Sequence, residues 1–292
     1  MLCIMSSLQP PPLLFTCASD LPSTPFLSFS DENLDGLFSG RGLPLRGIVE
    51  LSGEAGSGKT ALSMVIALRY AATYGRVSLI VNTEGPYPAA RLEALTNAVS
   101  GNDRTRSSEL IDLVRISDVR DAPALEAFLE ALPRAVVAAR IGLVVIDSIA
   151  APLRADLGAA GDAPERARWL IAVAAALLRL NAEAGVAVII VNQVTDIIEA
   201  DGGALEMAAA EGVRYIPRRA AAWSGGRWAR PALGPAWDSC VAHRIMLTHP
   251  RATTSRRGLC LMRSPIAPAA ALTFELGAGG LENTAPPVLI TD

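Results

Sequence analysis

The chain has 292 residues, 51% of them hydrophobic and 19% charged, which suits one large domain and excludes global disorder. Its formal net charge of −3 excludes a global positive field, so a nucleic-acid contact would need a local basic patch. The four cysteines contain no C-x-x-C pair and the two histidines add no metal-binding pattern, while the longest central apolar run is too short for a bilayer span. We therefore expect no structural metal and no membrane partner.

Residues 1–30 are rich in Pro, Ser and Leu, which predicts a flexible N-terminal arm. The arm lacks the Lys and Arg residues that a secretory or transit signal would carry. From about Asp31 the pattern becomes globular, and residues 31–292 predict one core domain. Within this domain, residues 195–238 show no convincing period and predict a long loop or insertion.

Apolar and amphipathic segments alternate along the predicted core. Strands are expected at residues 47–52, 77–82, 113–116, 143–147 and 186–191, with late strands near 244–248, 258–263 and 272–276. Helices are expected at residues 59–73, 89–99, 122–139 and 164–184, and a polar loop is expected up to residue 108. This alternation predicts an α/β fold with a mostly parallel central sheet, flanking helices and late antiparallel strands.

A phosphate-binding pattern lies between the first predicted strand and helix of the core. Residues 53–60 read GEAGSGKT and match G-x-x-x-x-G-K-[ST] in full, so backbone N–H groups and a helix N-terminus would face phosphates. The candidate nucleotide-binding residues are Gly53, Glu54, Ala55, Gly56, Ser57, Gly58, Lys59 and Thr60. Lys59 is the only lysine among 26 Lys and Arg residues, which indicates chemistry there that Arg cannot perform. We expect Lys59 to reach the phosphates and the Thr60 hydroxyl to bind Mg²⁺.

Polar residues stand at the ends of three predicted strands. Asp147 ends one strand and predicts a second Mg²⁺ residue, while Glu84 follows another and is the candidate base that activates water. Gln193 follows a third strand and is the candidate sensor of the γ-phosphate. Each could instead be a polar strand end without a catalytic role. With no further lysine, an Asn-Lys-x-Asp guanine-binding motif is excluded, and with it a GTPase that uses this motif.

The order of GKT, TEG, VVIDS and NQ resembles the RecA-type recombinase ATPases over about residues 31–285. Eukaryotic recombinase paralogues are most similar, and RPALGPAW at 230–237 favours the subfamily of the third X-ray-repair cross-complementing paralogue. This resemblance implies a RecA-like P-loop ATPase core that uses ATP and Mg²⁺ in homologous recombination and double-strand-break repair in the nucleus. It implies catalytic roles for Lys59, Glu84 and Gln193, metal binding by Thr60 and Asp147, and stacking of Arg91 on adenine. The implied partners are single-stranded or branched DNA, another recombinase paralogue as heterodimer partner, and the main strand-exchange recombinase.

The segments after Asp147 and Gln193 resemble the two DNA-facing loops of that family. The first contains Arg154, although residues 157–163 carry no basic side chain. The second is basic and aromatic between residues 212 and 237, and its arginines are Arg214, Arg218, Arg219, Arg227 and Arg230. Because Arg neutralises phosphates and aromatic rings stack on unpaired bases, this half predicts binding of single-stranded DNA. The alternative is an inert insertion.

Subunit contacts are predicted by two further features. Residues 15–18 read FTCA and resemble the Phe-x-x-Ala segment that links recombinase subunits, with Phe15 and Ala18 as anchors. Arg263 precedes Ser264-Pro265, where strand-exchanging recombinases carry an acidic residue that caps a neighbour's ATP, so modified contacts are expected. Paralogues usually carry an N-terminal helical domain, whereas only about 30 residues precede the core here.

Three functions are consistent with these motifs. The first is a DNA-dependent ATPase of the recombinase paralogue kind, with weak hydrolysis compatible with its site. The second is a nucleotide-bound assembly adaptor with little turnover. The third is another RecA-core ATPase, such as a small-molecule kinase, which would transfer phosphate to a metabolite without an effect of DNA.

Overall fold

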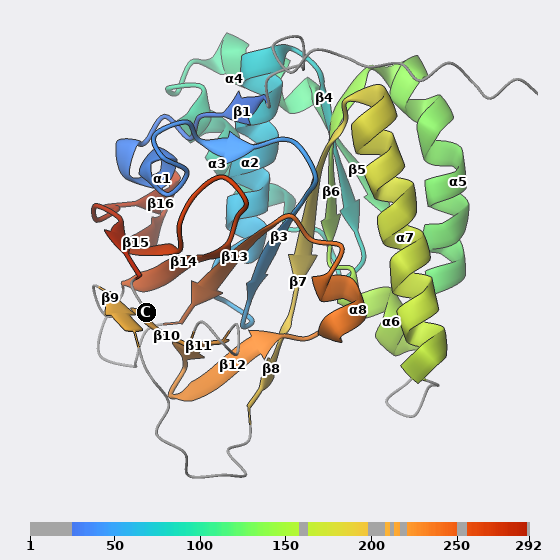
Figure 1. The fold of residues 1–292 in the computed structure, drawn as a ribbon. Coiled ribbons are helices and arrows are strands. Elements are labelled where there is room, and N and C mark those ends of the chain that lie inside the picture. The colour runs from blue at the N-terminus through green and yellow to red at the C-terminus, as the bar shows by residue number, and fades with distance from the viewer. Residues whose placement is uncertain are drawn as a thin grey trace, which may run out of the picture.

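A computed structural model describes residues 25–157, 163–197, 208–210, 213–216, 221–249 and 256–290. The centre of the molecule is a ten-stranded sheet ordered β16-β15-β14-β13-β3-β7-β6-β4-β5, with β17 beside β15 (Figure 1). Its parallel strands are β3 (Ile48–Gly53), β4 (Val77–Asn82), β5 (Val114–Asp118), β6 (Ile141–Asp147), β7 (Ala187–Asn192) and β13 (His243–Thr248). Its antiparallel strands are β14 (Arg257–Arg263), β15 (Ala270–Gly277), β16 (Gly280–Glu282) and β17 (Val288–Leu289).

Helices cover both faces of this sheet, as the ribbon in Figure 1 makes plain. On one face lie α2 (Lys59–Tyr74), α3 (Ala89–Val99) and α4 (Arg104–Asp112), whose apolar side chains share one core cluster with the sheet. On the other face lie α5 (Ala122–Ala139), α6 (Ala150–Leu157) and α7 (Ala163–Ala184), which form a second cluster. Strands buried on both faces explain the continuous apolar runs in the sequence. The fold confirms the predicted α/β class, with a mostly parallel sheet and late antiparallel strands.

Helix α4 differs from the expected polar loop. Its N-cap, Asp103, accepts hydrogen bonds from the backbone N–H groups of Thr105 and Arg106, which satisfies donors that the first helical turn leaves free. Leu110 is its only buried residue, so the helix has no apolar stripe that a periodicity argument could detect. The cap therefore marks the helix start where the pattern gives no signal.

Residues 25–30 correct the predicted boundary of the N-terminal arm. Strand β1 (Phe26–Leu27) pairs with β2 (Leu43–Pro44), and the side chains of Leu27 and Phe29 are buried in the core. Burial of these apolar side chains stabilises the segment against the sheet, so it belongs to the core domain. Residues 1–24, including Phe15 and Ala18, lie outside the described residues.

The described parts of residues 195–238 are not a loop, which corrects a second expectation. They form a five-stranded antiparallel sheet ordered β8-β12-β11-β10-β9, followed by α8 (Gly234–Asp238). The strands are β8 (Val194–Asp196), β9 (Ala208–Ala210), β10 (Val213–Ile216), β11 (Ala221–Ser224) and β12 (Arg227–Pro231). Trp223 and Trp228 face each other across β11 and β12 with ring centroids 5.3 Å apart at 81°, an edge-to-face contact. Consecutive buried alanines, Ala221 and Ala222, obscure the two-residue alternation that would have indicated a strand.

Candidate nucleotide-binding site

The loop between β3 and α2 has the shape of a phosphate cradle. Gly53, Gly56 and Gly58 take φ values of 153°, 75° and 108°, a region that side chains disfavour. A Cβ atom on Gly53 would lie 2.5 Å from the Leu247 carbonyl oxygen, so only glycine fits there. The Ser57 hydroxyl is buried and has no hydrogen-bond partner within the described part of the chain. A curved backbone with an unsatisfied polar group is suited to an anionic ligand.

A pocket of about 350 Å³ adjoins this loop and collects most of the predicted site residues. The residues that line it are Gly53, Glu54, Ala55, Gly56, Lys59, Thr60, Glu84, Asp147, Ser148, Val191, Gln193, Val194 and Arg227. Most of them lie at or just after the carboxyl ends of β3, β4, β6 and β7, which parallel strands bring to one edge of the sheet, while Arg227 comes from β12. The predicted catalytic and metal-binding residues therefore share a single cavity.

Lys59, Thr60 and Asp147 lie together in the lining of the pocket. The Thr60 hydroxyl is hydrogen-bonded to Asp147, and Lys59 Nζ donates to the Glu54 carbonyl oxygen at 2.7 Å. Burial raises the pKa of Asp147, against the opposing hydrogen bond from Thr60 and the charge of Lys59. Burial likewise lowers the pKa of Lys59, against the opposing charge of Asp147. Burial thus disfavours the charged form of each group, and the mutual attraction of Lys59 and Asp147 counteracts this effect.

The oxygens of Thr60 and Asp147 are hard ligands of the kind Mg²⁺ prefers. In the described ranges no group of three or more His, Cys, Asp or Glu side chains lies together as a metal site. A magnesium ion here would therefore draw its other oxygen ligands from phosphates and water, which is its usual coordination beside a nucleotide. The residues present fit that mode of binding.

Glu84 and Gln193 contact each other directly. Glu84 Oε1 accepts hydrogen bonds from Gln193 Nε2 and from the Ser148 hydroxyl, each at 2.8 Å. Ser148 is itself held by Thr83, whose hydroxyl oxygen accepts from the Ser148 backbone N–H at 2.7 Å. Thr83 also donates to the Ser148 carbonyl oxygen at 2.6 Å. A shift of Gln193 would therefore change the position of the Glu84 carboxylate.

Arg91 lies outside the lining of this pocket. It belongs to α3, and its guanidinium donates to the carbonyl oxygens of Gly277 at 2.5 Å and Ala278 at 3.4 Å. These contacts attach α3 to the end of β15. The stacking of Arg91 on adenine stays a prediction.

Of the predicted DNA-binding arginines, the structure describes the side chains of Arg227 and Arg230, both on β12. Arg227 lines the nucleotide pocket, and its contact with DNA stays a prediction. Arg230 is exposed on β12 beside a separate cavity that Trp237 also lines. Arg154 in α6 and Arg214 in β10 are described only as backbone. Arg218 and Arg219 lie outside the described residues.

Sequence analysis missed a buried polar cluster behind the phosphate loop. Glu50 in β3 is fully buried, and its Oε1 accepts from Asn192 Nδ2 at 2.7 Å and from Trp237 Nε1 at 2.9 Å. Its Oε2 accepts from Arg244 Nε. Asn192 directly precedes Gln193, so the cluster fixes the strand end that carries the predicted sensor. A charged residue within the apolar run GIVELS was the available signal.

The cluster continues from Arg244 to the surface. Arg244 also pairs with Asp238, which accepts from Arg263 Nη1 at 3.0 Å. Burial raises the pKa of Asp238, but its contacts with the two arginines outweigh this and hold the pKa below its ordinary value. Arg263 further donates to the carbonyl oxygens of Asp238 and Val241. Arg263 is thus engaged within its own chain, and its effect on subunit contacts stays a prediction.

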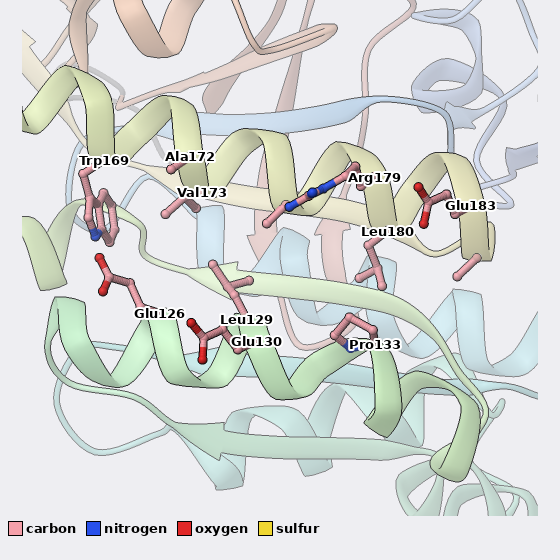
Figure 2. A pocket seen from close by; sticks show the side chains of 12 residues that line it. Glu126, Leu129, Glu130, Pro133, Trp169, Ala172, Val173, Arg179, Leu180 and Glu183 are labelled. Atoms are coloured by element: carbon pink, nitrogen blue, oxygen red, sulfur yellow. The ribbon is translucent and has the colours of Figure 1, made fainter. Parts of the chain in front are cut away.

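A second and larger cavity lies between α5 and α7 and has different chemistry. It measures about 590 Å³, and Figure 2 shows Trp169 and Leu180 of α7 facing Leu129 and Pro133 of α5. Its charged lining is mainly acidic, and none of the predicted nucleotide-site residues reaches it. It therefore lacks a phosphate cradle.

Within the described ranges, no helix is both long and apolar enough to cross a membrane.

The fold and the phosphate cradle define a RecA-type P-loop protein, and a model of the Rad51 family matches residues 26–284. The chain therefore belongs to the Rad51 family. DNA repair protein XRCC3 of Mus musculus is 30% identical over 244 residues, covering 78% of this chain and 64% of that protein. XRCC3 of Bos taurus is 30% identical over 277 residues, covering 88% and 74%. The XRCC3 homolog of Arabidopsis thaliana is 27% identical over 241 residues, covering 78% and 77%. These matches confirm the resemblance to the eukaryotic recombinase paralogues.

Proposed function

We propose that the protein is an ATP-dependent DNA repair protein of homologous recombination that acts on single-stranded or branched DNA. The pocket that joins the phosphate cradle to Glu84 and Gln193 carries this proposal, because it suits binding and hydrolysis of a nucleoside triphosphate. The printed names of the relatives, which are DNA repair proteins, support the DNA-related part. A nuclear location, a second paralogue as heterodimer partner and contact with the main strand-exchange recombinase belong to the same proposal.

Each residue of the pocket has a definite task in this scheme. The backbone N–H groups of residues 53–60 and Lys59 hold the phosphates, while Thr60 and Asp147 hold Mg²⁺, which neutralises phosphate charge when bound. Glu84 accepts the proton of the attacking water, a contribution of typically about 10²–10⁴-fold in rate. Gln193 positions Glu84 through their hydrogen bond. Because Gln193 directly precedes β8, a movement of its side chain when the γ-phosphate is lost would be passed on to that strand.

Measurements of nucleotide binding and of phosphate release distinguish the role of Lys59 from that of Glu84. Lys59→Ala is expected to abolish binding of a fluorescent ATP analogue, because it removes the lysine of the cradle. Glu84→Gln is expected to bind ATP like the wild type but to release phosphate about 10²–10⁴-fold more slowly. Glu109→Gln, which changes an exposed residue of α4, is the matched control. Equal phosphate release by wild type and Glu84→Gln would contradict the assignment of the base.

An assembly adaptor with little turnover is the second candidate. It is favoured by the ion pair of Arg227 with Glu54, which binds this arginine to the phosphate loop. In that case the wild type would bind ATP and its paralogue partner, while phosphate release would stay at the level of Glu84→Gln with or without DNA. The same set of variants therefore distinguishes the two functions.

A further inference from the structure

Arg227 reaches the nucleotide pocket from the distant strand β12. Its Nε atom lies 2.9 Å from Glu54 Oε1, in the phosphate loop, and 3.0 Å from Asp196 Oδ1, at the end of β8. The side chain is 56% exposed, so it borders solvent at the mouth of the pocket. Two carboxylates thus hold the guanidinium beside the loop where phosphates would bind.

The turn between β11 and β12 also contacts Glu54. The Ser224 hydroxyl donates to Glu54 Oε2 at 3.0 Å and accepts from the His249 backbone N–H at 2.8 Å. A Cβ atom on Gly225 would lie 2.8 Å from Glu54 Oε2, so glycine permits the close approach. Glu54 therefore fixes the turn, and with it Arg227, against the phosphate loop.

The balance of charged side chains in the pocket suggests a role for Arg227. Among the described residues that line the pocket, Lys59 and Arg227 are the only cations, facing the carboxylates of Glu54, Glu84 and Asp147. A triphosphate adds several negative charges, which a single lysine offsets only in part. The contacts of Arg227 with Glu54 and Asp196 use Nε, while its two Nη groups belong to the same planar fork that binds phosphate oxygens well.

We propose that Arg227 is a second phosphate-binding cation, supplied by the chain itself, that contacts the terminal phosphates and favours ATP over ADP. It lies at the start of β12, which pairs with β8, the strand that follows Gln193. Glu54 and Asp196 hold it in place before the nucleotide binds. This inference rests on the proposed ATP binding and replaces the expected role of Arg227 in DNA contact.

Affinities for fluorescent ATP and ADP analogues test this role in the full chain. Arg227→Gln is expected to lower the affinity for ATP about tenfold and the affinity for ADP less than threefold. Arg227→Lys, which keeps the charge but loses the planar fork, is expected to restore part of the ATP affinity. Arg256→Gln is the matched control, because Arg256 is an exposed arginine outside the pocket, and it is expected to change neither affinity. Thermal melting of each variant verifies that it folds.

Each alternative outcome has a distinct meaning. Unchanged ATP affinity in Arg227→Gln, or equal losses for ATP and ADP, would overturn the proposed selectivity. A loss of affinity for single-stranded DNA with unchanged nucleotide affinities would return Arg227 to a DNA contact and overturn the proposal. Absence of ATP binding by the wild type, with no difference from Lys59→Ala, would refute the proposed function itself.

Discussion

Lys59 illustrates at the residue scale how composition and geometry agree. Arginine stands at every other basic position of the chain, whereas the cradle keeps a lysine. In the structure its ammonium group donates to the Glu54 carbonyl oxygen and lies in the field of Asp147. A slim ammonium group fits between the loop and the carboxylates, whereas the wide guanidinium fork needs more room. The same reasoning places Arg227 at the open mouth of the pocket.

His243 connects stability to pH. It is buried at the start of β13, where its Nδ1 lies 3.0 Å from the Ser264 hydroxyl oxygen and its ring packs edge-on against Phe38. Burial lowers the pKa of His243 to about 4, and the charge of Arg263 adds to this shift. Because the unfolded chain binds a proton below about pH 6.5 and the folded chain only below about pH 4, acid favours unfolding in this window.

We therefore expect the free energy of unfolding to fall as the pH decreases from about 6.5 to 4, by up to about 3 kcal/mol. Urea unfolding across this range measures the slope. His243→Gln is expected to remove the His243 part of it, while His249→Gln is expected to keep it. The same slope in His243→Gln and wild type would contradict the assignment to this residue.

At the scale of elements, the Glu50 cluster joins β3, β7, α8 and β13 behind the phosphate loop. A buried charge is tolerated only when it is paired and hydrogen-bonded, and Glu50 meets this condition through three donors. The cluster links the strand that begins the cradle to Asn192, the residue before the predicted sensor. Its main consequence is that β3 and β7 keep a fixed register at the site.

Replacing Arg244 measures how much the buried ion pair with Glu50 contributes to the free energy of unfolding. Arg244→Met leaves Glu50 buried without its cation and is expected to cost about 3–5 kcal/mol of unfolding free energy. Arg120→Met breaks the exposed pair with Asp118 and is expected to cost less than about 1 kcal/mol. Urea unfolding of both variants provides the comparison. Similar small losses in the two would show that the buried pair does not hold these elements together.

Particular elements show how far sequence reasoning reaches. Strands such as β3 and β7 were predicted because they are buried on both faces and are therefore apolar throughout. The phosphate loop was predicted because its glycines and lysine match a phosphate-binding pattern in full. Helix α4 was missed because its surface is polar, and β11 because its alanines are buried on both faces of a small sheet. Contacts between side chains far apart in the sequence, such as Arg227 with Glu54, could not be predicted, because they depend on how distant segments pair in the fold.

At the scale of the whole molecule, the predicted nucleotide-site residues and the start of the small sheet lie at one edge of the large sheet. The carboxyl ends of β3, β4, β6 and β7 carry the pocket, and the small antiparallel sheet begins there with β8 (Figure 1). The turn between β11 and β12 returns to the phosphate loop through Glu54. A nucleotide in the pocket would therefore contact both sheets, which gives a physical route from ATP binding to the surface of the smaller sheet.

Binding of fluorescein-labelled single-stranded DNA, measured by anisotropy with and without ATP and Mg²⁺, tests the central claim most directly. We predict that ATP strengthens binding by the wild type, alone or with a co-expressed paralogue partner, and that Lys59→Ala loses this effect. Absence of DNA binding in every nucleotide state, with and without the partner, would contradict a nucleotide-gated DNA repair protein.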